Sequence, residues 1–317
     1  MTAIIRHLKL LLFWLPASIA AAAPVGYSVN SDAPDGDSLY QIDLGTGQET
    51  LIGKLQSLGV VRSDTEGLAI DPTGVLWGVD DESQKLFPIN TGDGAVEYQS
   101  EVGIIGIGTL SGNDFGMTFT CSGDAYVTSV ATHSLYRISM NGTATLIGSV
   151  GALGANISAI AAWGSPPKLY ALGNGLISEG GPQDNRTLYS IDLNTGVAEP
   201  IGPVGPAVAD YYQAGLSFDS EGTLWAITDR RGAEQTFGSQ ILTLDTQTGL
   251  ATLHFTTTGV GYESLAVAAP GGCSIDPGAP ADEPDRIPTL GTIGKILTAL
   301  VLLVIGWVSL RSRMARH

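Results

Sequence analysis

The sequence predicts an all-β protein: a five-bladed β-propeller of four-stranded antiparallel blades, with an N-terminal signal peptide and a C-terminal transmembrane helix. Three observations predict the propeller. Two strand–turn–strand phrases recur between residues 24 and 270. The chain of 317 residues contains 42 glycines, which favours short strands and tight turns over helices. Finally, a strand missing from the first repeat is present as a spare after the last.

The first phrase is a hairpin, in which an alternating strand, a turn rich in Thr, Asn, Asp and Gly, and a second strand follow one another. Glycine supplies the positive φ that such turns require. The five copies are SLYQIDLGTGQETLIGKL from Ser38, KLFPINTGDGAVEYQSEVG from Lys85, SLYRISMNGTATLIGSVG from Ser134, TLYSIDLNTGVAEPIGPVG from Thr187 and QILTLDTQTGLATLHFTTTG from Gln240.

The second phrase, for example GLAIDPTGVLWGVDD from Gly67, precedes four of these hairpins and adds two more strands. Together the phrases form a unit of about fifty residues, the size of a propeller blade. The first unit has only GYSVN (residues 26–30) and a hairpin, whereas SLAVAAP from Ser264 is left over at the end. Pairing them closes a ring of five blades, which neither a β-sandwich nor a solenoid explains. Six blades remain open if the longer fourth unit contains more structure.

The first residues have the pattern of a signal peptide. Arg6 and Lys9 form a short basic region, residues 10–15 an apolar core, and residues 20–22 supply small side chains before a cleavage site. We expect residues 1–22 to be removed on export. The propeller, residues 24–270, then lies outside the cytoplasm.

The other end combines a linker with a membrane segment. Residues 271–286 are rich in Pro, Gly and acidic residues and are expected to form a flexible linker. Residues 296–310 contain no charge and are followed at once by Arg311, Arg313 and Arg316. This pattern is typical of a transmembrane helix with a cytoplasmic end, so residues 287–317 are expected to attach the protein to the membrane.

Ile287, Pro288, Thr289 and Leu290 begin this tail. Together with the apolar segment and the basic end, they resemble the IPTL-CTERM sorting tail of bacterial surface proteins. The resemblance implies that a membrane-embedded, exosortase-type sorting enzyme recognises and removes the tail, although Ile293-Gly294 stands where the family usually has Trp-Gly. The implied location is the periplasmic side of the inner membrane, then the cell surface or the medium.

The charge of the body excludes some classes of partner, and its cysteines allow one disulfide. All 31 acidic residues but only nine of the 15 basic residues lie between the two targeting segments, so the exported body carries a formal charge of about −22. Such a surface repels nucleic acid and anionic lipid. Cys121 and Cys273, in an oxidising compartment, can form one disulfide, and the sequence leaves open whether they do.

The repeats resemble those of known propellers. The phrase LYxIDxxTGxxTxIG is similar to the repeat of bacterial surface propellers that often carry sorting tails. It is also similar to the repeat of pyrroloquinoline-quinone dehydrogenases, but the docking Trp that follows Thr-Gly there is absent from all five copies, which argues against a quinone enzyme. Glu66-Gly67-Leu68, followed by Asp80, resembles gluconolactonase-like calcium-dependent hydrolases, which implies that Glu66 is a metal ligand.

In a propeller, the starts of the innermost strands and the ends of the second strands meet at one mouth of the axis. Glu66, Glu263 and Asp80 are therefore candidate metal ligands, and their hard oxygen atoms favour Ca²⁺. A water-filled acidic funnel without an ion is the alternative. Further candidate binding residues at the same mouth are Asn30, Asn174, Asp229 and Arg230.

No catalytic residue can be assigned. The chain lacks a GxSxG motif, and His133 and His254, the two histidines of the body, lie in a turn and a strand where structural roles are expected. The preferred interpretation is a non-enzymatic propeller, surface-anchored or released, that binds a partner or a carbohydrate. The alternative is a calcium-dependent hydrolase or lyase acting on a sugar or lactone at the axis.

Overall fold

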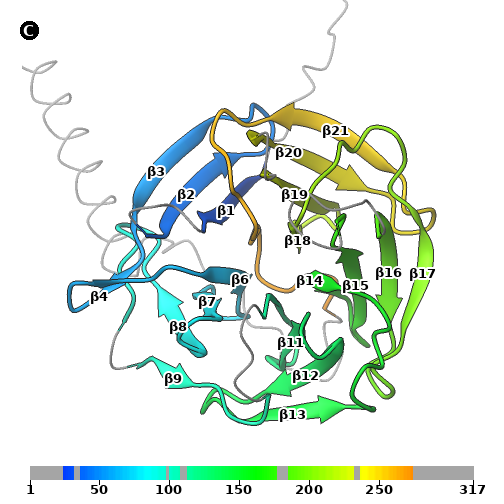
Figure 1. Cartoon of the computed structure of the whole chain (residues 1–317), viewed down its shortest axis with the longest axis horizontal. Helices are drawn as coiled ribbons and strands as arrows, with labels where there is room; N and C mark the ends of the chain where they lie inside the picture. The colour runs from blue at the N-terminus through cyan, green and yellow to red at the C-terminus, as the bar shows by residue number, and fades with distance from the viewer. Residues whose placement is uncertain are drawn as a thin grey trace, which may run out of the picture. The chain divides into compact units, whose positions relative to one another are not determined.

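The computed structural model describes residues 24–31, 36–97, 100–107, 113–176, 185–231 and 236–273, which form the all-β ring in Figure 1. The chain divides into two compact units, Met1–Cys273 and Ser274–His317, and every described residue belongs to the first. The predicted signal peptide, the sorting motif, the tail and the linker from residue 274 lie outside the described residues. Within these ranges no helix has the length and apolar character needed to cross a bilayer.

Five sheets make the blades, as predicted. The first contains β1 (Val25–Asn30), β2 (Ser38–Asp43) and β3 (Glu49–Lys54). The second contains β6 (Thr65–Ile70), β7 (Leu76–Asp80), β8 (Lys85–Ile89) and a short β9 (Val102–Gly103). The third contains β10 (Phe115–Phe119), β11 (Ala125–Ser129), β12 (Ser134–Ile138) and β13 (Ala144–Ile147).

The last two sheets repeat this order. The fourth blade contains β14 (Ile157–Trp163), β15 (Lys168–Gly173), β16 (Thr187–Ile191) and β17 (Ala198–Pro203). The fifth contains β18 (Ala214–Phe218), β19 (Leu224–Arg231), β20 (Thr236–Leu244) and β21 (Ala251–Thr256). A small hairpin of β4 (Gln56–Ser57) and β5 (Val60–Val61) follows the first blade.

Residues 262–266 lie beside β1, joined to it by two isolated bridges, and take the place of the missing inner strand of the first blade. Tyr27 and Ala266 exchange two backbone hydrogen bonds of 2.7 and 2.9 Å, and Asn30 forms a second antiparallel bridge with Tyr262. The Ser28 hydroxyl donates to the carbonyl oxygen of Ser264 at 2.5 Å. The predicted closure by the two complementary fragments is therefore confirmed.

A tryptophan and an aspartate stabilise the turn between the first two strands in two blades. In the second blade the indole N–H of Trp77 donates to Asp71 Oδ2 at 2.9 Å, and in the fifth Trp225 donates to Asp219 Oδ2 at the same distance. The other carboxylate oxygen of each aspartate accepts backbone amides of the turn. The repeated aromatic residue thus joins the turn to the packed blade face.

The axis is narrow because small residues allow the inner strands to approach each other. A Cβ at Gly116 would lie 2.7 Å from the carbonyl oxygen of Ser158, and one at Gly215 would lie 2.3 Å from the backbone of Ser264. The cavity lined by these strands measures about 10 Å³, enough for about one water molecule. The axis is a packed core and not an open channel.

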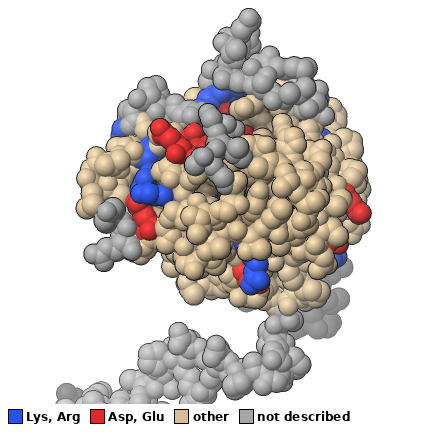
Figure 2. All heavy atoms as spheres, turned by 60° about the horizontal axis from the view of Figure 1, so that its bottom comes forward, with Lys and Arg blue, Asp and Glu red and all other residues tan. Residues whose placement is uncertain are grey.

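The chain crosses the axis at the face where the inner strands end, which we call the exit face. Residues 268–271 line a cavity of about 20 Å³ there, and Gly164 N–H donates to Gly271 O at 2.9 Å. A disulfide joins Cys273 to Cys121, which lies in the β10–β11 turn. On the side shown in Figure 2, charged side chains of both signs form small separate groups on a mainly uncharged surface.

Candidate functional site

Three blades contribute side chains to the opposite end of the axis, where the inner strands begin. Glu66, the second residue of β6, is 5 % exposed. Its carboxylate accepts the backbone N–H of Phe115 at 3.1 Å and the side-chain amide of Gln213 at 3.2 Å. Phe115 begins β10 and Gln213 precedes β18, so Glu66 joins the second, third and fifth blades.

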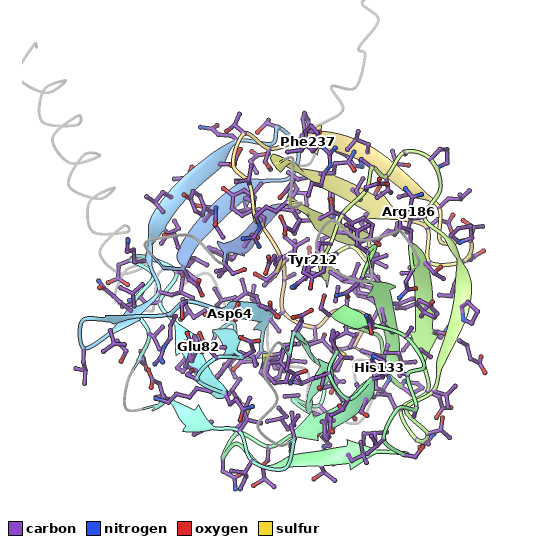
Figure 3. All side chains as sticks on the ribbon, viewed as in Figure 1. Asp64, Glu82, His133, Arg186, Tyr212 and Phe237 are labelled. Carbon is purple, nitrogen blue, oxygen red and sulfur yellow. A yellow bond between two sulfur atoms is a disulfide. The ribbon has the colours of Figure 1, made fainter. Side chains whose placement is uncertain are left out.

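Glu66 belongs to a cluster of three carboxyl groups. One oxygen atom from each of Asp64, Glu66 and Asp81 lies within 4.8 Å of the other two, and we call these residues the acidic cluster. Asp64 precedes β6 and Asp81 follows β7, and Figure 3 places Asp64 on the inner side of the second blade. The start of the first strand and the end of the second strand thus bring the three groups together.

Burial and mutual repulsion act strongly on these carboxyl groups. Desolvation raises the pKa of Glu66 well above its usual range, and the charges of Asp114, Asp81 and Asp64 raise it further. Burial, a hydrogen bond with Asp64 and the neighbouring carboxylates raise the pKa of Asp81 to about 9. Without a cation, the cluster therefore retains protons at neutral pH.

The donor set fits a hard divalent cation. Asp81 Oδ1 and Gln213 Oε1 are buried acceptors with no hydrogen-bond donor among the described residues. Calcium binds six to eight oxygen atoms at about 2.3–2.6 Å, so two of its ligands lie at most about 5 Å apart. The spacing within the acidic cluster satisfies this limit, and the two unpartnered oxygen atoms are of the type such an ion binds.

The structure separates the three expected metal ligands. Glu66 lies in the acidic cluster, whereas Glu263 forms an ion pair with Arg231 and accepts a hydrogen bond from Ser31. Asp80 Oδ1 accepts the backbone N–H of Ser83 at 2.8 Å. Asp64 and Asp81 were not among the expected ligands, although each lies within two residues of one in the stretches DTEG and VDD.

Three of the four expected binding residues, Asn30, Asn174 and Asp229, lie near this mouth but make mainly internal contacts. Asn174 Oδ1 accepts from Ser158 N at 2.9 Å. Asp229 pairs with Arg231 at 3.0 Å, and Asn30 donates to a backbone carbonyl. Arg230 lies over the ring of Phe237, 4.8 Å from its centre. Asn30, Asn174 and Asp229 therefore bind neighbouring segments at this mouth, whereas Arg230 contacts Phe237, which Figure 3 places at the outer edge of the ring.

The two histidines of the body contact other parts of the molecule. His254 shares a hydrogen bond of 2.9 Å with Thr243 on the outer strands and packs on Trp225 at 5.1 Å between ring centres. His133 occupies a positive-φ turn position, φ 46°, and lies toward the rim in Figure 3. Both positions agree with structural roles.

No protein-family model matches the sequence, and no curated protein matches it. Solved propellers resemble the fold. A protein of unknown function from Bacteroides thetaiotaomicron is 17% identical with a TM-score of 0.43, over 63% of this chain and 52% of that chain, so the match spans about half of that protein. An inactive virginiamycin B lyase from Staphylococcus aureus, with quinupristin, is 17% identical over 77% and 73%, with a TM-score of 0.41. Regucalcin, a calcium-binding protein from Agrobacterium tumefaciens, is 17% identical over 78% and 79%, with a TM-score of 0.41.

Proposed function

We propose that this protein is an exported, non-enzymatic propeller that binds Ca²⁺ in the acidic cluster and, through that ion, an oxygen-rich partner such as a carbohydrate. The observation that carries the proposal is the convergence of three buried carboxyl groups next to two buried oxygen atoms without donors. A bound cation neutralises the carboxylates and supplies the missing partner of both oxygen atoms.

The narrow axis favours binding over turnover. The inner strands leave a cavity of only about 10 Å³ beyond Glu66, so a ligand of the cluster would remain at the mouth. No nucleophile paired with a histidine accompanies the cluster in the described part of the chain. A partner would therefore meet the cation at this end of the axis and not between the inner strands.

One observation favours the enzymatic alternative, a calcium-dependent hydrolase or lyase acting on a sugar or lactone. Buried carboxyl groups with raised pKa values can act as general acids or bases. Glu66 and Asp81 have this property. Measuring lactone and glycan cleavage with and without Ca²⁺ distinguishes the binding function from the enzymatic one. Calcium binding without turnover supports the binding function.

Calorimetric titration of the EDTA-treated protein with CaCl₂ tests the site. We expect a saturable heat that Glu66→Gln weakens by about tenfold or more, because it removes a charged ligand. Glu263→Gln is the matched control, since this buried glutamate is paired with Arg231 and should leave calcium affinity unchanged. Absence of heat together with an unchanged melting temperature in calcium contradicts the proposal.

We further propose that the body reaches the outside through the signal peptide and is held there, until processing, by residues 287–317. The support is the order of features in the sequence: Ile287 to Leu290, the uncharged segment and the terminal arginines. The partner implied for this step is an exosortase-type enzyme in the membrane.

A further inference from the structure

A second concave site lies on the exit face, between the fourth and fifth blades. It measures about 520 Å³ and is bounded by the β14–β15 and β16–β17 turns of the fourth blade and by Thr246 from the β20–β21 turn of the fifth. Its apolar side includes Tyr170 and Ile201, and its rim includes Lys168, Asp192 and Asn194. Nothing in the mouth site accounts for this pocket, which we call the lateral pocket.

The lateral pocket occurs where the fourth blade departs from the repeat. Strand pairing aligns Tyr170 opposite Ala161 as it aligns Trp77 opposite Ala69, so Tyr170 occupies the position of the repeated tryptophan. Trp163, the last residue of β14, takes the place of Asp71, because each stands two residues after the aligned alanine. The fourth blade therefore lacks the indole and the carboxylate that the second and fifth blades have at this position, as does the third blade, where Tyr126 and Thr120 stand there.

Trp163 is directed to other neighbours. Its ring lies against Phe218 with 5.1 Å between ring centres and against Gly271, where a Cβ would lie 2.4 Å from the indole. Tyr170 stands edge-on to Phe218 at 5.5 Å, which fixes its ring. Tyr170 lines the lateral pocket, and its hydroxyl group forms no hydrogen bond within the described residues.

The rim of the lateral pocket carries one negative and one positive side chain, and the negative one is held in place by hydrogen bonds. Asp192 Oδ1 accepts the backbone amides of Asn194 at 2.8 Å and Thr195 at 2.9 Å, and these bonds lower its pKa and keep it charged. Lys168 is exposed and forms no ion pair within the described residues. The two charges cancel, and Asn194 and Thr246 add neutral donors and acceptors beside an apolar wall.

We propose that the lateral pocket binds a neutral saccharide of one or two rings. Its volume lies within the range of about 300–1,000 Å³ found for small-molecule sites with an apolar lining and few polar groups. A sugar ring presents C–H groups to Tyr170 and Ile201 and hydroxyl groups to Lys168, Asp192 and Asn194. A phosphate or carboxylate would meet Asp192 with only one cation, and an apolar ligand would leave the rim charges without partners.

Calorimetry of the full-length protein with maltose, cellobiose, lactose and N,N′-diacetylchitobiose tests this inference. At least one sugar should bind. Tyr170→Trp should abolish that binding, because it restores the indole of the second and fifth blades. Tyr170→Phe should weaken it by about tenfold, the value of one hydrogen bond to a ligand. Asn194→Ala, at an exposed position, should also weaken it and provides a second variant if Tyr170→Trp does not fold.

Two controls distinguish this site from others. Tyr126→Phe alters the corresponding position of the third blade and should leave sugar affinity unchanged. Glu66→Gln should also leave it unchanged, so failure of the calcium proposal does not affect this result. Absence of binding by all four sugars overturns the inference. Binding that survives Tyr170→Trp, or that is lost in Glu66→Gln alone, overturns it as well.

Discussion

Arg231 forms an ion pair with Glu263 and thereby joins the second strand of the fifth blade to the strand that completes the first. The same guanidinium donates to Asp229 and to the carbonyl oxygen of Ser31, both at 3.0 Å. The side chains of Asp229 and Glu263 are each 1 % exposed. One arginine therefore holds together the chain segments that meet where the ring closes.

Replacing Glu263 by Gln should destabilise this closure. The variant leaves Arg231 with a single buried carboxylate, and breaking a buried pair costs up to about 3–5 kcal/mol of unfolding free energy, so we expect about 1–3 kcal/mol with Asp229 still present. Urea denaturation measures the change. Glu221→Gln, at an exposed turn position, is the control and should change the midpoint little. Equal midpoints for both variants would show that the ion pair is not needed for closure.

The raised pKa of Asp37 should make the free energy of unfolding depend on pH. Asp37 is fully buried, Oδ2 accepts the Thr65 backbone N–H at 2.6 Å, and desolvation raises its pKa from 3.8 to about 7. The folded state therefore holds a proton that the unfolded state releases, and this group reduces stability as pH rises from about 4 to about 7.

The variant Asp37→Asn keeps the acceptor and stays neutral. It should gain stability over the wild type between pH 4 and pH 8, on the order of 2 kcal/mol. Denaturation curves in EDTA across this range provide the measurement. A difference between the two proteins that does not vary with pH would show that Asp37 does not titrate in this way.

The disulfide should stabilise the exit face. It spans 152 residues, and closing a loop of this size in the unfolded chain corresponds to about 2–5 kcal/mol. Cys273→Ala should lower the melting temperature, and reducing agent should lower that of the wild type but not of the variant. If reduction leaves the wild-type melting temperature unchanged, the disulfide adds no stability.

Pro288→Ala tests the tail. If a sorting enzyme reads residues 287–290, cells producing the variant should accumulate precursor that retains residues 296–317, whereas wild-type protein should lose them. Intact mass spectrometry of membrane and medium fractions measures both. Wild-type protein that retains the segment would indicate a plain membrane anchor.

Much of the fold was predictable because each blade repeats a local pattern. The Thr-Gly turns and alternating strands defined the hairpins, and the spare strand at Ser264 defined the closure. The outermost strand of the second blade was less predictable, because β9 is only Val102–Gly103 and follows an irregular segment. Local pattern does not determine where a short outer strand pairs.

The sequence indicated at which end of the axis acidic residues gather, but not which carboxyl groups contact one another. Glu66 is the second residue of β6 and lines the cavity between the inner strands, but the distances between blades decide which carboxyl groups meet. Asp81 lies one residue beyond Asp80, and the strand end directs Asp81 to the cluster and Asp80 to Ser83. The pairing of Glu263 with Arg231 depends on a contact between the fifth and first blades that no local pattern contains.

The position of the disulfide has a mechanical consequence. A pulling force applied at Cys273 would pass through the sulfur atoms into the β10–β11 turn of the third blade, on the far side of the closing strand. Residues 262–266 would then bear little of the load, although a strand pulled from its free end would otherwise unzip one bond at a time. If the protein is held through the residues that follow Cys273, as proposed above, the ring should resist peeling as long as Cys121 and Cys273 remain oxidised.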